Sequence, residues 1–243
     1  MNVSNAIYKK EVLIWTPVLA TEPINMLLEW VYAVKKAGFD NVVLIYNGPG
    51  SERATTELQK EISGSKILIT CLSGPASIGA CQEFVTHIFL RSKARFLVRL
   101  DSDLQFPVKC AEKLLLHFEI QPGAVCPDVI VGQREEASTG GYLHFLGNAV
   151  LRLFALLFGI FADPNSGFYA LNRKAAALLC NVPLSNYPEP RMLVAFRQAL
   201  FGVTTCVVPT LPRHAGRSSI RGFWQALKVF TRSFLELVSC NLI

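Results

Sequence analysis

Two carboxylates separated by one residue follow an apolar run in the sequence RFLVRLDSDLQFP, residues 95–107. Asp101 and Asp103 carry like charges that repel each other at this spacing, so something must stabilise the pair. A divalent cation is one solution, because Mg²⁺ and Mn²⁺ prefer carboxylate oxygens and leave room for water or diphosphate oxygens. The alternative is a turn in which Asp103 is the N-cap of a following helix. The strands and helices expected around the pair indicate which of these two interpretations is the better one.

The first half of the chain alternates short apolar runs with longer helical segments. Strands are expected at 11–17, 41–47, 66–72, 95–100 and 128–134, with helices between them. The runs VVLIY and ILIT are continuous rather than alternating, which is typical of strands that are covered on both faces of a parallel sheet. Strand–helix repetition implies right-handed crossovers. We therefore predict an α/β fold with a doubly wound, mostly parallel sheet and helices on both faces.

The second half is less regular. An apolar helix is expected at 143–161, a strand at 166–172, a helix from 189 that ends at Gly202, and a strand at 203–209. A basic loop follows at 210–219. The chain has no clear linker, so residues 1–219 are predicted to form one domain and residues 220–243 a C-terminal amphipathic helix.

The carboxyl ends of the strands are the expected ligand site, because doubly wound sheets bind ligands there. Asp101 and Asp103 follow one such strand. The turn YNGPGS, residues 46–51, follows another and precedes a helix, where a phosphate or ribose could bind. Ser51 and Ser77 are each expected as the N-cap of a helix.

Composition restricts the class of partner. The net charge of +6 and the pI of about 9.0 favour anionic partners such as nucleotides or acidic membrane surfaces. No block of consecutive Lys and Arg is present, so no nucleic-acid partner is expected. Seven cysteines are scattered singly without a C-x-x-C pair, which argues against a zinc site and against a disulfide framework. A cytoplasmic location is the expectation.

Several segments resemble, in the same order, those of family 2 GT-A glycosyltransferases, especially the polyprenyl-phosphate (dolichyl-phosphate) mannosyl and glucosyl transferase branch. LDSDLQFP is similar to the LDADLQHPP-type segment, VGQR to the V-x-G-S-R strand end, and DPNSGFYALNRKA to the D-x-x-SGFR-x-x-x-R segment. YPEPRMLVAFRQALFGVTTCVVP resembles the Y-x-x-E helix with its G-x-x-x-x-x-V-P strand, and RHAGRSS resembles the R-x-x-G-x-S loop. The likeness extends from about Val12 to Ser219.

The resemblance implies a Rossmann-like GT-A fold, a GDP- or UDP-sugar donor, Mg²⁺ or Mn²⁺, and a polyprenyl-phosphate acceptor. It implies that Asp101 and Asp103 bind the metal and that Asp103, Glu189 and Arg213 are catalytic. The residues implied for donor binding are Pro17, Asn47, Asp101, Ser102, Asp103, Gln105, Arg134, Ser166, Arg213 and Ser218. From its position alone, Glu189 at a helix start is equally well explained as a favourable partner of the helix dipole.

Two stretches depart from the family pattern. Where the family has P-x-x-N-E this chain has PVLATEP, so the Asn is missing and Glu22 is displaced. Where the family has D-D-G-S it has YNGPGS, and Asn47 stands in for the base-reading Asp. A family 2 transferase that extends a glycan or a lipid-linked oligosaccharide is one alternative function. A catalytically weak, membrane-associated subunit that retains the fold is the other.

The C-terminal segment RGFWQALKVFTRSFLELVS is amphipathic. One face carries Phe223, Leu227, Phe230, Phe234 and Val238, and the opposite face carries Arg221, Gln225, Lys228 and Arg232. Such a helix can lie in a membrane interface, or it can pack on the domain. Both readings remain open, with peripheral contact at the cytoplasmic face of a membrane as the functional expectation.

Overall fold

The structure is a computed structural model, and it describes residues 9–62, 67–72, 77–118, 126–135, 150–153, 155–157, 159–211 and 222–239. Within the last range, the side chains of residues 222–226, 229 and 239 are not described.

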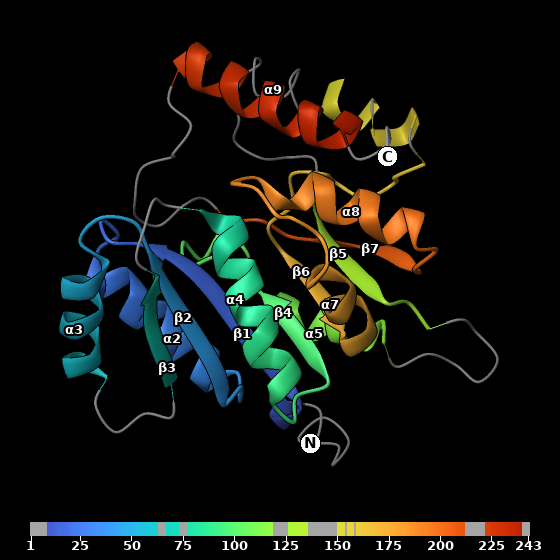
Figure 1. Cartoon of the computed structure of the whole chain (residues 1–243). Coiled ribbons are helices and arrows are strands. Elements are labelled where there is room, and N and C mark those ends of the chain that lie inside the picture. Colours follow the sequence, from blue (N-terminus) through green and yellow to red (C-terminus); the bar gives the residue numbers. More distant parts are fainter. Residues whose placement is uncertain are drawn as a thin grey trace.

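A seven-stranded sheet with the order β3-β2-β1-β4-β6-β5-β7 forms the centre of the molecule (Figure 1). Neighbouring strands are parallel except at β6, which is antiparallel to both β4 and β5. The strands are β1 (Val12–Leu19), β2 (Asn41–Asn47), β3 (Ile67–Leu72), β4 (Phe96–Arg99), β5 (Val129–Arg134), β6 (Tyr169–Asn172) and β7 (Val203–Val208). The predicted mostly parallel, doubly wound sheet is confirmed.

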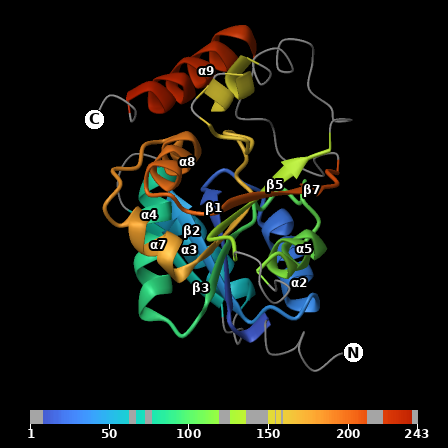
Figure 2. The same cartoon turned by 90° about the vertical axis from the view of Figure 1, so that its right-hand side faces the viewer.

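Helices cover both faces of this sheet (Figure 2). The first core cluster lies between the sheet and α2 (Ile24–Lys36), α3 (Ser51–Glu61) and α5 (Lys109–Leu116). The second lies under α4 (Ile78–Arg91), α7 (Arg173–Leu179) and α8 (Pro188–Gln198). The continuous apolar strands supply alternate side chains to the two clusters: Val42 and Leu44 of β2 face one, while Val43 and Ile45 face the other.

Two serines were expected to cap helices, and one of them does. The Ser77 hydroxyl accepts a hydrogen bond from the backbone N–H of Ala80 at 3.2 Å and caps α4. The expectation for Ser51 is wrong, because Gly50 is the N-cap of α3 and the Ser51 hydroxyl donates to the Gly48 carbonyl at 2.6 Å. Gly48 and Gly50 have φ of +102° and +81°, a region that glycine adopts without strain.

Helix α8 ends earlier than predicted. Its last residue is Gln198, and Leu200 takes the left-handed conformation with φ of +58°. Gly202 serves a different purpose, since a Cβ on it would lie 3.3 Å from the Pro127 Cα. Its N–H also donates to the Asp128 carboxylate at 3.0 Å, so it holds the start of β7 against the start of β5.

The C-terminal helix α9 (Gly222–Ser239) packs on the domain. Phe230 and Phe234 are partly buried against the second core cluster, and Leu237 is fully buried in it. An ion pair of 2.6 Å joins Glu236 to Arg191 of α8. The packed alternative is therefore the one found, with part of the predicted aromatic face turned inward. Across the described ranges, no helix has the length and hydropathy to cross a bilayer.

Candidate functional site

The sheet topology brings several loops to one edge. Because β1, β2, β4 and β5 are parallel, their carboxyl ends meet there, and antiparallel β6 adds its amino end. Asn47 ends β2, Arg134 ends β5, and Asp101 follows β4 by two residues. The Ser166–Gly167 turn precedes β6 and reaches the same edge. Residues far apart in sequence are thus gathered where the sequence predicted a ligand site.

Asp103 forms a turn and does not cap a helix. Its carboxylate oxygen Oδ1 accepts from the backbone N–H of Gln105 at 3.1 Å, and Leu104 between them has φ of +55°. The N-cap of α5 is Val108, without a side-chain cap, so the capping reading of Asp103 is wrong. The Gln105 carbonyl accepts from the backbone of Leu211 at 2.8 Å, which ties this turn to the segment after β7.

Glu22, in the loop between β1 and α2, joins the two aspartates. Its carboxylate accepts from the Ser102 hydroxyl at 2.6 Å and from the backbone N–H of Leu19 at 3.1 Å. Burial raises the pKa of Glu22 above its usual 4.5, and the charges of Asp101 and Asp103 raise it further. We call these three carboxylates the acidic edge. Glu22 is displaced from its position in the family's sequence pattern, but the fold of the β1–α2 loop places its side chain beside Ser102 and the two aspartates.

The acidic edge fits a divalent cation shared with a ligand. Across the described ranges, no group of three or more His, Cys, Asp or Glu side chains is placed to hold a metal ion by itself. The oxygen donors of Asp101 and Asp103 suit Mg²⁺ or Mn²⁺, which bind through one or two carboxylates together with substrate phosphates. Burial is the main cause of the raised pKa of Glu22, and the repulsion from Asp101 and Asp103 that adds to it is what such a cation would relieve.

Arg99 lies directly behind the acidic edge and is 4% exposed. Its Nε donates to Asp101 Oδ1 at 3.2 Å, and its Nη1 donates to Glu189 Oε1. The guanidinium carbon lies 5.5 Å from the centre of the Trp15 ring and 5.9 Å from that of Tyr169. Burial opposes the charged form, but Asp101 and then Glu189 outweigh it and raise the pKa of Arg99 above its ordinary value. We call Arg99, Glu189, Trp15 and Tyr169 the arginine cluster.

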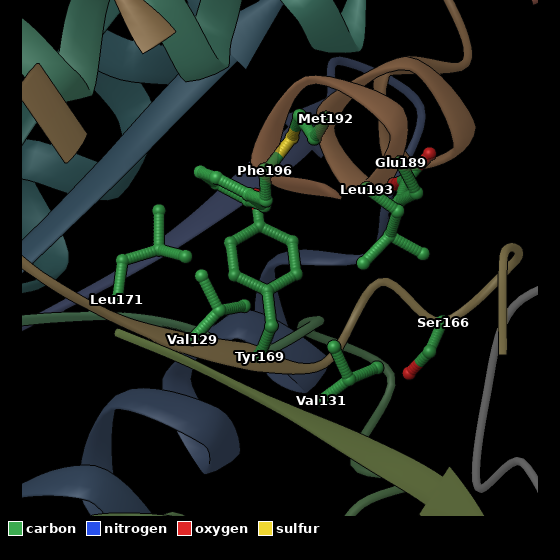
Figure 3. A pocket seen from close by; sticks show the side chains of 9 residues that line it. All are labelled: Val129, Val131, Ser166, Tyr169, Leu171, Glu189, Met192, Leu193 and Phe196. Carbon is green, nitrogen blue, oxygen red and sulfur yellow. The ribbon is translucent and has the colours of Figure 1, made fainter. Parts of the chain in front are cut away.

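Glu189, in the first turn of α8, is 12% exposed and belongs to this cluster. A small pocket lies between the sheet and α8 (Figure 3). Besides Glu189, Ser166 and Tyr169, the pocket is lined by apolar side chains, those of Val129, Val131, Leu171, Met192, Leu193 and Phe196. Such a lining does not suit a diphosphate, so the acidic edge is the stronger ligand site.

The Ser166–Gly167 turn supports the junction of the two groups. The Ser166 hydroxyl donates to the Gly132 carbonyl at 2.6 Å and links β5 to the turn. A Cβ on Gly167 would lie 2.9 Å from Arg99 Nη2 and 2.9 Å from Asp101 Oδ2. Glycine is needed here because the backbone lies directly against the Arg99–Asp101 ion pair.

The other predicted donor-binding residues surround the same edge. Asn47 is buried and is paired in register with Leu19 at the end of β1. The Arg134 guanidinium lies 5.6 Å from the centre of the Phe106 ring, so the end of β5 contacts the aspartate loop. Pro17 lies in β1, beyond the residues that pair with β4, so its missing N–H breaks no hydrogen bond to that strand. Arg213 and Ser218 lie outside the described residues, and their roles stay predictions.

Sequence reasoning missed Arg99 and did not place Glu22 in the site. Arg99 stands inside the apolar run RFLVRL, and a charged residue in a buried strand almost always has a charged partner. That rule was a usable signal. The position of Glu22 depends on how the β1–α2 loop folds back, which the spacing of the residues does not reveal.

No protein-family model and no curated protein matches the chain. Solved structures do match. Glucosyl-3-phosphoglycerate synthase from Mycobacterium tuberculosis, in complex with Mn²⁺ and UDP-glucose, aligns with a TM-score of 0.71 at 15% identity, over 99% of this chain and 83% of that one. Its complex with Mn²⁺, UDP-glucose and phosphoglyceric acid aligns with a TM-score of 0.69 at 15% identity, over 97% of this chain and 82% of that one. The structure of a mycobacterial protein aligns with a TM-score of 0.71 at 14% identity, over 99% of this chain and 78% of that one.

At these identities the likeness shows the fold. The chain has the Rossmann-like GT-A fold predicted from the sequence, and the synthase that shares this fold binds a nucleotide-sugar and Mn²⁺.

Proposed function

We propose that the protein is a metal-dependent glycosyltransferase that moves a sugar from a UDP- or GDP-sugar to a polyprenyl phosphate at the cytoplasmic face of a membrane. The observation that carries the proposal is the acidic edge. Glu22, Asp101 and Asp103 are brought together from two loops at the carboxyl ends of β1 and β4, in a GT-A fold. Like charges kept together in this way favour a divalent cation, which can in turn bind the phosphates of a ligand.

In the proposed reaction, an acceptor phosphate oxygen attacks the anomeric carbon of the donor sugar. The bond from that carbon to the diphosphate breaks, and the nucleoside diphosphate leaves with the electron pair. A bound Mg²⁺ or Mn²⁺ would supply charge compensation for the departing diphosphate. Asp101 and Asp103 would hold the cation, with Arg134 and Arg213 providing the planar, bidentate contacts that phosphates favour.

The arginine cluster supports an acceptor that needs no general base. Glu189 lies in an ion pair with buried Arg99, so its carboxylate is held by the guanidinium and is not free to take the position of a base beside an acceptor. A sugar hydroxyl would require such a base, because it is neutral at pH 7. A phosphate monoester, with a second pKa of about 6, arrives already anionic.

The donor half of the proposal is tested by calorimetric titration of UDP, GDP and their sugars, with and without Mn²⁺. Asp103→Asn should weaken Mn²⁺-dependent binding by at least about tenfold, because it removes one charge of the metal site. Asp40→Asn is the matched control, since Asp40 is 60% exposed at the start of β2. Absence of nucleotide binding in the parent protein would favour the inert-subunit alternative.

The acceptor half is tested by single-turnover assays with polyprenyl phosphate. Arg213→Ala should cost far more activity than Glu189→Gln, because the proposed acceptor depends on charge compensation. The reverse ranking, with Glu189→Gln inactive and Arg213→Ala near normal, would indicate a hydroxyl acceptor and favour glycan extension.

A further inference from the structure

The segment 150–162 is apolar on two sides. Its inner side chains, Leu151, Ala155, Ile160 and Ala162, are at most 5% exposed and pack in the second core cluster. Its outer side chains are Leu153, Leu156, Leu157 and Phe161, with exposed fractions of 59%, 48%, 72% and 80%. A segment that is apolar all round is usually covered on both sides. Here the core covers only one of them.

Few charges interrupt this outer surface. In the described part of 150–162, Arg152 is the one charged residue. Its Nη2 forms an ion pair of 3.1 Å with buried Asp163, which turns that charge toward the domain. Four large apolar side chains exposed within nine residues exceed the scattered exposure that is ordinary on a protein surface.

Helix α9 lies beside this segment in both views of the molecule (Figures 1 and 2). Leu227 and Leu235 on the outer side of α9 are 41% and 56% exposed. Lys228 and Arg232 are exposed next to them. The one acidic residue of α9, Glu236, pairs with Arg191 of α8 at 2.6 Å. The exposed charges among the described side chains of α9 are therefore positive.

A third basic residue borders the segment from another side. Arg197 of α8 is exposed, and its Nε lies 3.1 Å from the position that a Cβ on Gly159 would occupy. An apolar centre with basic residues at its margin matches the surface of an anionic bilayer, where apolar side chains enter the interface and Lys or Arg contact the headgroups.

We propose that this apolar surface, made by Leu153, Leu156, Leu157, Phe161 and Leu235, lies in the interface of an anionic lipid bilayer. A second copy of the chain is a poorer occupant, because a symmetric dimer through this face would bring its basic margins toward each other. The contact thus involves Leu153, Leu156, Leu157 and Phe161 together with Leu235 on the outer side of α9, whereas Phe230 and Phe234 pack on the domain.

The surface is also connected to the candidate site. Asn165 Oδ1 accepts from Ser233 of α9 at 3.4 Å, and the next residue begins the Ser166–Gly167 turn. Figure 2 shows α9 at the end of the molecule toward which β1 and β5 point. As an explanation of how a lipid-borne acceptor reaches the acidic edge, the inference rests on the proposed function. The lipid contact itself rests on the surface alone.

The test is flotation of the full chain with phosphatidylcholine vesicles, with and without phosphatidylglycerol. We expect the parent to float with the anionic vesicles and to be released by salt. Leu157→Glu with Phe161→Glu should reduce flotation by at least about tenfold, because carboxylates do not enter the interface. The matched control is Leu68→Glu with Leu116→Glu, because these side chains lie outside the proposed surface and are 46% and 54% exposed. This control variant should float like the parent.

Equal flotation of the two double variants, or no flotation of the parent, would overturn the proposal. So would light scattering that shows a parent dimer converted to a monomer by Leu157→Glu with Phe161→Glu, since a second copy would then cover the surface. Nucleotide binding is measured on the same samples. If the flotation pattern holds while no variant or parent binds nucleotide, the proposed function fails and the lipid surface stands.

Discussion

The acidic edge and the arginine cluster are joined by the ion pair between Asp101 and Arg99, but charge is arranged in opposite ways in the two groups. In the acidic edge, Glu22, Asp101 and Asp103 concentrate negative charge, and their repulsion adds to burial, the main cause, in raising the pKa of Glu22. In the arginine cluster, Arg99 is enclosed by aromatic rings and neutralised by two carboxylates. Charge that is balanced within the protein holds the structure together, whereas charge left in excess is available to a ligand.

This difference predicts that Arg99→Met has the largest effect on stability. It would leave Asp101 and Glu189 without their shared buried cation, which costs about 3–5 kcal/mol in comparable cases. That corresponds to a melting temperature lower by on the order of 10 °C. Thermal unfolding measured by circular dichroism checks it.

The matched control for this prediction is Arg95→Met. Arg95 pairs with Glu11 at 2.9 Å but is 58% exposed, so its loss should cost less than about 1 kcal/mol. The double variant Arg99→Met with Glu189→Met should recover part of the lost stability, because it removes an uncompensated charge together with its partner. Equal melting temperatures for Arg95→Met and Arg99→Met would contradict the role of the cluster.

Gly167→Ala sharpens the comparison at the point where the two groups join. Its methyl group would lie 2.9 Å from both Arg99 Nη2 and Asp101 Oδ2, so one of them must move. We expect a loss of about 1–3 kcal/mol in stability, as for overpacking, with weaker Mn²⁺-dependent nucleotide binding. Gly202→Ala is a comparable substitution away from the site. It should retain nucleotide binding. Parallel titrations of both variants check this, and equal losses of nucleotide binding would contradict the prediction.

Glu22→Gln tests the acidic edge alone and should have the smallest effect. Burial and then Asp101 and Asp103 raise the folded-state pKa of Glu22 above 4.5. Between the unfolded and folded pKa values the folded protein binds more protons, so the stability that Glu22 contributes is present at low pH and lost as pH rises. Gln stays neutral and can keep both hydrogen bonds, because the Ser102 hydroxyl can also accept.

The melting temperature of Glu22→Gln at pH 7 should therefore exceed that of the parent by a few degrees at most. Melting curves in the absence of metal, taken from pH 7 down to pH 4, should show this advantage shrink. An advantage that grows as pH falls would mean that Glu22 is stabilised in its charged form, contrary to the acidic edge as described.

The sheet was predictable because its determinants are local. The continuous apolar runs, the turn at Gly48–Gly50 and the paired aspartates after β4 all follow from short stretches of sequence. The orientation of β6 was not predictable, since four residues of YALN fit either direction equally well. The exposure of Leu153, Leu156, Leu157 and Phe161 was not predictable either, because a run of Leu and Phe gives no indication of which side chains the core will cover.

The candidate site was also predictable only in part. Asp101 and Asp103 are separated by one residue in the sequence, and their place at the strand end identified the edge. The arginine cluster joins Arg99 to Glu189 across 90 residues, and only the packing of α8 on the sheet brings them together. Glu22 falls between these cases, because its loop is near β1 but its contact with Ser102 depends on the neighbouring strand.

The antiparallel strand β6 has a consequence for how the chain is synthesised. It separates β4 from β5, so β4 has no partner on that side until Tyr169–Asn172 leave the ribosome. Strands β1 to β4 can pair as soon as they emerge, and they then present an open edge in an incomplete molecule. Open edges recruit other chains. The nascent protein is therefore most prone to aggregation after β4 is made and before β6 closes that edge, and chains that terminate in this interval should be the insoluble ones.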